Sequence, residues 1–156
     1  MLKLDIPGFG SLRLMYLVLD FNGTLAVDGR LLLGVKTRLG RLSRRLDLHV
    51  LTADTFGSAR GALTNVPCEL AILPRERQDR AKLAYVRRLG SATTACIGNG
   101  RNDRLMLKAA ALGIAVLQEE GAALEALMAA DLVTPGIVEA LDALNNPLRL
   151  VATLRS

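Results

Sequence analysis

The sequence predicts an α/β fold in which a mainly parallel sheet is covered by helices on both faces. Short apolar runs alternate with longer amphipathic stretches along almost the whole chain, a pattern typical of strands connected through helices. Apolar residues make up 51% of the sequence and aromatic residues only 3%, so the core must be aliphatic. The 156 residues contain no linker rich in Ser and Pro, and they fit one domain spanning 1–156.

The first half of the chain predicts three strands, a flap and two helices. An apolar run over 12–19 predicts a strand that ends at Asp20. Residues 25–33 have an Asp-Gly pair at their centre, which predicts a small hairpin-like flap. Apolar residues three and four positions apart predict a helix over 34–46. A strand, a helix and a strand closed by a proline are then expected over 48–51, 55–63 and 69–73.

The second half continues the same alternation. A helix is predicted over 78–89, where Gly90 ends it, and a strand over 93–97 runs into the glycine turn 98–101. An Asn-Asn-Pro sequence ends the last helix, and the apolar tail 148–154 follows it. Between the glycine turn and the Asn-Asn-Pro sequence, three helices are predicted over 102–111, 121–130 and 135–144. Two strands are predicted between them, over 114–117 and 132–134.

The end of the first strand carries the most chemical information in the chain. Asp20 closes the apolar run, and Asn22, Gly23 and Thr24 follow it. Open α/β sheets bind ligands at the carboxyl edge of their strands, and a glycine-bearing turn can present N–H groups to an anion there. A carboxylate at such a point can act as the nucleophile of phosphoryl transfer. The structural alternative is a solvated Asp in an ordinary turn.

Composition excludes several classes of protein. The longest apolar runs fall far short of the roughly 20 residues that span a bilayer, and the first residues do not form a secretory signal. Cys68 and Cys96 lack CxxC spacing and suit a reducing compartment. We therefore expect a cytoplasmic protein without membrane segments. The scarcity of aromatic residues disfavours a nucleic-acid-binding platform.

Basic residues give the chain a net charge of +5 and form two clusters at helical spacing. We interpret both clusters mainly as solvated helix faces, although they can also attract phosphorylated ligands or nucleic acid. The first cluster is Arg38, Arg41, Arg44 and Arg45, and the second is Arg75, Arg77, Arg80, Lys82, Arg87 and Arg88.

Four segments, each near the carboxyl end of a predicted strand, resemble the haloacid dehalogenase (HAD) superfamily of phosphatases and phosphotransferases. In order they are 20–24, Thr52, Lys82 and 98–103. The last segment also resembles the hinge motif of P-type ATPases and their small soluble relatives. The resemblance implies a Rossmann-like three-layer sandwich. The short gaps between the segments imply a HAD-like core with no large cap domain.

The resemblance also implies a role for each matching residue. Asp20 would be the nucleophile, Thr52 would donate its hydroxyl to the phosphoryl oxygens, and Lys82 would neutralise the developing charge. A Mg²⁺ cofactor would screen the repulsion between carboxylate and phosphate. The implied phosphate-binding residues are Asn22, Gly23, Thr24, Thr52, Lys82 and Asn102. The implied metal-binding residues are Asp20, Asn22 through its main-chain carbonyl, Asn99 and Asp103.

Two positions depart from the pattern of the superfamily. Asn22 stands where its phosphatases usually carry a second Asp that transfers protons, and such a group typically contributes about 10²–10⁴-fold. Asn99 replaces a metal-binding Asp, so we expect weaker Mg²⁺ binding. A phosphatase or phosphotransferase with attenuated turnover is one interpretation, and a weakly or non-catalytic module that binds a phospho-ligand or partner is another. Nucleic-acid end processing is the third and least favoured.

Each residue also has a structural interpretation. Thr52 could cap the following helix, Lys82 could lie on a basic surface, and Asp103 could be a charge that favours a helix N-terminus. His49 lies within an apolar strand and is expected to be a hydrogen-bonded core residue. The partner is expected to be a phosphorylated substrate, and a homo-oligomer is possible through the flap at 31–33 and the apolar tail.

Overall fold

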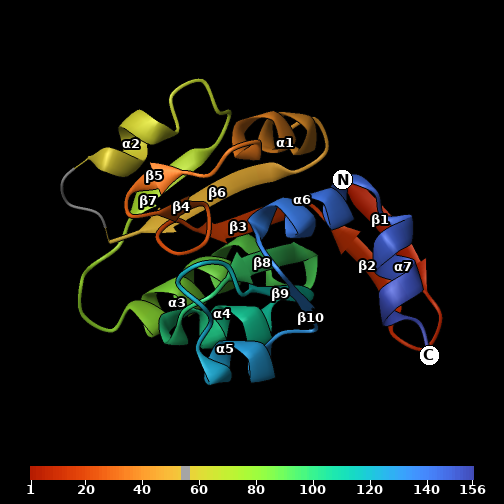
Figure 1. Cartoon of the computed structure of the whole chain (residues 1–156). Coiled ribbons are helices and arrows are strands. Elements are labelled where there is room, and N and C mark those ends of the chain that lie inside the picture. The colour runs from red at the N-terminus through yellow and green to blue at the C-terminus, as the bar shows by residue number, and fades with distance from the viewer. Residues whose placement is uncertain (54–56) are drawn as a thin grey trace.

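A six-stranded sheet forms the centre of the computed structural model, which describes residues 1–53 and 57–156 (Figure 1). The strand order is β10-β9-β8-β3-β6-β7, and every neighbouring pair is parallel. The predicted parallel sheet is therefore confirmed. Along the chain its strands are β3 (Tyr16–Asp20), β6 (Asp47–Thr52), β7 (Glu69–Ile72), β8 (Thr94–Gly98), β9 (Leu112–Val116) and β10 (Leu132–Thr134).

Helices cover both faces of this sheet, which confirms the three-layer sandwich. One face carries α1 (Val35–Leu42) and α6 (Ile137–Asn145), which pack against each other (Figure 1). The other face carries α3 (Gln78–Leu89), α4 (Arg104–Ala109) and α5 (Leu124–Ala129). Helices α1 and α5 are shorter than the ranges expected from the sequence. In the described part of the chain, no helix has the length and apolar character needed to cross a membrane.

The strand alternation divides the core into two halves. Leu17 and Leu19 are fully buried on the side of α1 and α6. Val18, between them, is buried in a separate cluster with Val86 of α3 and Met106 of α4. Successive side chains of a strand point to opposite faces, so a strand as apolar as β3 requires cover on both sides. The aliphatic composition supplies that cover.

The predicted strand 12–19 is wrong because the chain leaves one sheet and enters another within it. Residues Leu2–Ile6 (β1) and Gly10–Leu14 (β2) form a separate antiparallel pair. Met15 then crosses to the central sheet, where its N–H donates to the carbonyl of Thr93 at 2.8 Å. Apolar residues continue on both sides of Met15 without Gly, Pro or another turn residue, so the break leaves no signal in the sequence.

The predicted flap is the hairpin of β4 (Ala26–Val27) and β5 (Arg30–Leu31). Asp28 and Gly29 at its tip both have positive φ, 51° and 74°, as a tight hairpin turn of the primed type requires. This hairpin is the whole of the regular structure between β3 and α1, so no large cap domain is inserted there.

Another helix, α2 (Ser58–Ala62), accounts for part of the predicted helix 55–63. Residues 55 and 56 of that prediction lie outside the described residues. The side chain of Ala59 in α2 is buried in the same core cluster as α1, so α2 belongs to that side of the sheet.

The apolar tail is a helix, α7 (Leu148–Leu154), that packs beside β1 at one side of the molecule (Figure 1). Leu150 is fully buried, whereas Leu148 is 82% exposed. The backbone N–H of Ser156 donates to the carbonyl of Pro7 at 3.1 Å and ties the two chain ends to one unit. Leu150 is therefore not available as an oligomer contact, contrary to the prediction that included it.

Candidate phosphoryl-transfer site

The candidate site lies at the carboxyl edge of the central strands. Asp20 ends β3, Thr52 ends β6, and Gly98 ends β8. The chain passes from β3 to β6 and β7 on one side, and later to β8, β9 and β10 on the other. The strand order thus reverses between β3 and β8, and open α/β sheets bind ligands at such a switch point.

One buried lysine joins two carboxylates at this edge. Lys82 Nζ donates to Asp20 Oδ1 and to Asp103 Oδ1, both at 2.6 Å. The exposed fractions are 1% for Lys82, 6% for Asp20 and 0% for Asp103. The interpretation of Lys82 as a surface residue of the basic cluster is therefore wrong. Its position on the inner side of α3 directs the ammonium group between the ends of β3 and β8.

Burial and charge determine how this triad titrates. Burial, together with the negative charge of Asp103, raises the pKa of Asp20 to about 7, although Lys82 opposes the shift. Burial alone would lower the pKa of Lys82, but the two carboxylates outweigh it and raise that pKa. Lys82 therefore stays protonated. With both carboxylates ionised, the triad carries one net negative charge, which a bound cation would neutralise.

The turn after Asp20 is held by contacts from distant segments. Thr24 Oγ1 donates to Asp20 Oδ2 at 3.1 Å and lies 3.3 Å from Asn99 Oδ1. Gly23 has φ of 79°, and a Cβ there would lie 2.7 Å from Asn99 Nδ2. Only glycine fits this position without moving the neighbouring amide.

Gln118 is a supporting residue that sequence reasoning missed. Its Nε2 donates to the carbonyls of Gly23 at 2.9 Å and Thr24 at 2.7 Å, and its Oε1 accepts the N–H of Ile137 at 3.0 Å. Gln118 thus fixes the turn against the start of α6. Its position just after the predicted strand 114–117 was the one available signal, because that strand also ends at the carboxyl edge.

Asp103 shapes the loop that follows β8. Its Oδ2 accepts the N–H groups of Asn99 at 3.0 Å and Gly100 at 2.9 Å, while Oδ1 accepts from Lys82. A Cβ at Gly98 would lie 2.5 Å from Asp103 Cγ. Both oxygens of Asp103 are therefore engaged within the protein, through the 3₁₀ turn Arg101–Asp103 that precedes α4.

The remaining predicted residues lie around this centre. Asn22 Nδ2 donates to Thr52 Oγ1 at 3.4 Å, so these two side chains contact each other, and Thr52 is buried. Asn102 Nδ2 donates to Gln78 Oε1 at 2.8 Å and joins the loop to the start of α3. The structure thus brings Asp20, Thr24 and Lys82 together directly with Asn99 and Asp103. Thr52 contacts Asn22, which lies in the turn after Asp20, and Asn102 hydrogen-bonds to Gln78 of α3.

The oxygen donors fit a hard cation held by few protein ligands. Asp20 Oδ2 and Asn99 Oδ1 both lie within hydrogen-bond distance of the Thr24 hydroxyl, so they are close to each other. Mg²⁺ prefers oxygen ligands and keeps several waters. Because these donors are oxygens of a carboxylate and an amide, they suit Mg²⁺ better than a soft metal such as zinc.

His49 lies away from this site, near the start of β6. Its Nδ1 is 2.9 Å from the hydroxyl of Tyr85, which donates to Glu69 at 3.0 Å. Burial lowers the pKa of His49, which favours the neutral ring. The expectation of a hydrogen-bonded structural histidine is confirmed.

Comparison with known sequences finds two partial relatives, and no family model matches the chain. The uncharacterized protein MJ0073 of Methanocaldococcus jannaschii is 51% identical over 59 residues, 38% of this chain and 63% of that protein. The chain thus spans less than two thirds of this relative. The uncharacterized protein MJ0072 of the same organism is 49% identical over 41 residues, 26% of this chain and 93% of that protein. The chain belongs to the family of MJ0072.

Solved structures identify the fold. A hydrolase of HAD superfamily subfamily III A from Legionella pneumophila superposes with a TM-score of 0.71 at 17% identity, covering 90% of this chain and 87% of that chain. The chain has the haloacid dehalogenase fold. The 3-deoxy-D-manno-octulosonate 8-phosphate phosphatase of Moraxella catarrhalis, in complex with magnesium and phosphate, shares this HAD fold with a TM-score of 0.69 at 14% identity, covering 91% and 87%.

The HAD fold of this chain is also similar to part of a much longer protein. A zinc-transporting PIB-type ATPase matches with a TM-score of 0.59 at 25% identity, over 79% of this chain and 20% of that chain. Both halves of the predicted resemblance, to HAD hydrolases and to P-type ATPases, thus correspond to observed similarities of the HAD fold.

Proposed function

We propose that the protein is a Mg²⁺-dependent phosphatase or phosphotransferase that acts through an aspartyl-phosphate on Asp20. The observation that carries the proposal is the buried contact of Lys82 with both Asp20 and Asp103 at 2.6 Å. Burying three charges costs stability even when they are paired, and a carboxylate with a perturbed pKa at a switch point, as Asp20 has, is typical of an active site. The phosphatase activity named for the Moraxella catarrhalis neighbour supports the same reaction class.

The chemistry proceeds in two displacements on phosphorus. A carboxylate oxygen of Asp20 forms a bond to the phosphorus while the bond to the leaving oxygen breaks, and that oxygen departs with the electron pair and takes a proton from water. Water then attacks the phosphorus while the bond between phosphorus and the Asp20 oxygen breaks. A proton of this water passes to the hydroxide left by the first step, inorganic phosphate leaves, and the carboxylate is restored. Lys82 neutralises charge on Asp20 and the transferring group, and Thr52 with the N–H groups of the turn donates to phosphoryl oxygens.

Asp20, Asn99 and the carbonyl of Asn22 would hold the Mg²⁺ ion, with Asp103 acting through water because its oxygens are engaged. When bound, the ion supplies charge neutralisation between carboxylate and phosphate. The magnesium and phosphate present with the Moraxella catarrhalis enzyme support this choice of cofactor.

The test is hydrolysis of p-nitrophenyl phosphate and acetyl phosphate with and without Mg²⁺. We expect Mg²⁺-dependent turnover that Asp20→Asn abolishes. Asp47→Asn is the matched control, because Asp47 is an exposed acid at the opposite end of β6, and it should keep the wild-type rate. Equal rates for the wild type and Asp20→Asn would overturn the proposal.

A second candidate is a weakly or non-catalytic module that binds a phospho-ligand or partner. Asn22 and Asn99 favour it, because neither amide can replace the proton transfer or the charge of a carboxylate. Beryllium fluoride trapped on Asp20 without turnover of any phosphate ester would support this candidate, whereas robust turnover would exclude it.

We further propose a cytoplasmic location and a homo-oligomer that covers the open site. Cys68 and Cys96 are both free thiols, as a reducing compartment requires. Leu33, the last residue of the predicted flap 25–33, is 96% exposed, and an apolar side chain so exposed is suited to a protein contact. Sedimentation at several concentrations tests the oligomer, and a monomer throughout would exclude it.

A further inference from the structure

An open pocket of about 420 Å³ lies beside the candidate phosphoryl site. Two segments line it, the start of α3 with the loop before it and the turn after β8. A pocket of this size accommodates a small metabolite. Its lining residues are Arg75, Arg77, Gln78, Asp79, Arg101, Asn102 and Arg104.

The pocket and the catalytic triad share their supporting elements. Gln78 lines the pocket and Lys82 belongs to the triad, and they lie four residues apart on α3, about 6 Å along the helix axis. Asn102 lines the pocket and immediately precedes Asp103, and its Nδ2 bonds to Gln78 Oε1 at 2.8 Å. A ligand whose phosphate lies at Asp20 could therefore extend its other end toward the pocket.

The pocket is basic, with four arginines and one aspartate among its lining residues. Asp79 pairs with Arg104 at 2.7 Å, and Arg104 also donates to the carbonyl of Arg101 at 2.8 Å. Arg104 is thus held in place by the protein. The other arginines outnumber the acid, even though Arg101 lies 3.1 Å from Glu125 at the exposed rim.

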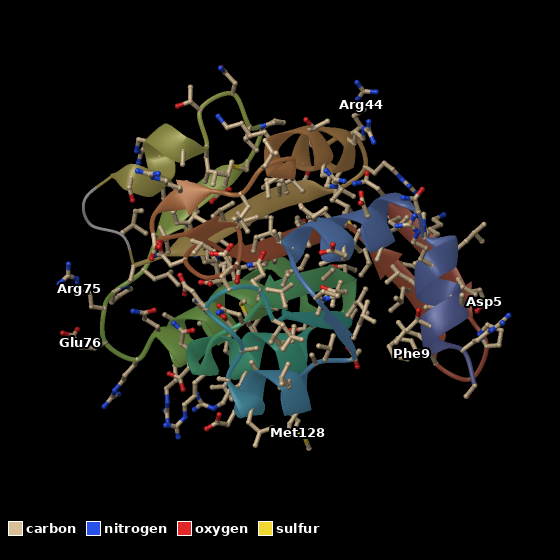
Figure 2. All side chains as sticks on the ribbon, viewed as in Figure 1. Asp5, Phe9, Arg44, Arg75, Glu76 and Met128 are labelled. Atoms are coloured by element: carbon tan, nitrogen blue, oxygen red, sulfur yellow. The ribbon has the colours of Figure 1, made fainter. Side chains whose placement is uncertain are left out.

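This arrangement differs from a solvated helix face. The arginines come from two segments separated in sequence and line one hollow. Figure 2 shows Arg75 at the edge of the molecule just before α3 begins, far from Arg44 of the other basic cluster. Guanidinium groups bind carboxylates and phosphates through paired hydrogen bonds. A second anion is therefore the chemistry that matches the lining.

We propose that this arginine pocket binds a second anionic group of the substrate. The substrate class is then small phosphorylated molecules that carry a carboxylate or a second phosphate in addition to the transferred phosphate. The inference rests on the proposed function for the reaction, but the pocket can be tested by binding alone.

The experiment compares ligands that differ in the far group. Glucose 6-phosphate has no second anion, 6-phosphogluconate adds a carboxylate, and fructose 1,6-bisphosphate adds a phosphate. We expect at least one of the two doubly anionic ligands to bind the wild-type protein about 10-fold or more tightly than glucose 6-phosphate, and to show a KM lower by the same factor. Which one binds tightly distinguishes a carboxylate from a phosphate.

The variant Arg77→Asn with Arg101→Gln removes two guanidinium groups, and Asn tolerates the positive φ of 52° at position 77. It should bring the three dissociation constants to within about twofold of one another. Arg44→Ala, in the other basic cluster, should retain the discrimination.

Two outcomes separate this inference from the proposed function. If the wild type hydrolyses p-nitrophenyl phosphate but binds all three ligands equally, the pocket inference is overturned and the reaction stands. The opposite outcome is that no ester is hydrolysed, a doubly anionic ligand binds the wild type tightly, and the double variant no longer binds it tightly. The pocket inference is then supported and the proposed reaction is wrong.

Discussion

Asn22 determines how fast the proposed intermediate can break down. Its amide lies 3.4 Å from the Thr52 hydroxyl, two residues beyond Asp20, and it cannot give or take a proton at useful pH. The leaving oxygen and the attacking water must then exchange protons with solvent. In the proposed mechanism, we therefore expect a long-lived phosphoenzyme.

Replacing Asn22 with Asp should accelerate hydrolysis. A carboxylate in the same place supplies the missing proton transfer, a contribution of about 10²–10⁴-fold in enzymes, and we expect at least about tenfold here because the site was not built around it. Acetyl phosphate turnover in Mg²⁺ measures the effect. Asn22→Ala is the control and should show no gain. An unchanged rate in Asn22→Asp would mean that proton transfer does not limit turnover.

Asp20 should make stability depend on pH. Burial and the charge of Asp103 raise its pKa from 3.8 to about 7, so between these values the folded protein holds a proton that the unfolded chain has released. Folding stability contributed by this group is therefore lost as the pH rises toward 7. In Asp20→Asn without Mg²⁺, that loss disappears.

We expect the stability of Asp20→Asn relative to wild type to rise by roughly 3 kcal/mol between pH 5 and pH 8. Urea unfolding at the two pH values measures the difference. A relative stability that stays constant with pH would show that Asp20 titrates as an ordinary exposed carboxylate.

The residues of the site were predictable where the signal was local. Asp20 and Thr52 each end an apolar run, and the glycines of 98–103 mark a turn. The burial of Lys82 was harder to predict, because α3 also carries Arg80, Arg87 and Arg88. The local signal was that Tyr85 and Val86, three and four positions further on, are apolar and share its buried face. Gln118 was missed because its contacts with residues 23 and 24 depend on a partner more than 90 positions away.

At the scale of elements, α4 lies unusually close to β9. A Cβ at Gly113 of β9 would overlap the carbonyl oxygen of Leu107 in α4. Both elements lead to or from the site, since α4 follows Asp103 and β9 leads to Gln118. The close packing of α4 on β9 therefore helps to fix Asp103, which precedes α4, relative to Gln118, which follows β9.

Gly113→Ala should destabilise the protein by about 1–3 kcal/mol, because the backbone of α4 must move to admit the methyl group. Gly40→Ala in α1 is the matched control. A Cβ at Gly40 meets nothing within 4 Å, so alanine should stabilise that helix by about 0.5–1 kcal/mol. Thermal unfolding of both variants tests the pair, and a stable Gly113→Ala protein would refute the close contact.

Elements were predicted well in type and less well at their ends. Helix α3 begins and ends where the periodicity and Gly90 place it. The change of sheet at Met15 could not be predicted, because what separates β2 from β3 is their pairing with distant partners.

At the scale of the whole molecule, β1, β2 and α7 form a small unit that closes one side of the core. Leu150 of α7 belongs to the same buried cluster as Leu2 and Ile6 of β1. The composition predicted an aliphatic core. It did not predict that the C-terminal helix α7 would pack against β1 and contribute to that core. The prediction of one domain stays a prediction, although this shared cluster favours it.

Leu150→Ala should lower the free energy of unfolding by about 2–5 kcal/mol, as a cavity in a buried leucine site does. Leu148→Ala, on the same helix but 82% exposed, should change it by less than about 0.5 kcal/mol. Urea unfolding of the two variants compares them directly. Similar effects for both would mean that α7 does not contribute to the core.

The position of the two chain ends has a practical consequence. Both belong to the unit of β1 and α7 (Figure 1), across the molecule from the acid that ends β3. A fluorescent reporter or an affinity tag fused to either end would therefore leave the carboxyl edge of the sheet open to solvent. A surface that binds such a tag would hold the protein by the unit of β1 and α7, and ligands could still reach the candidate site.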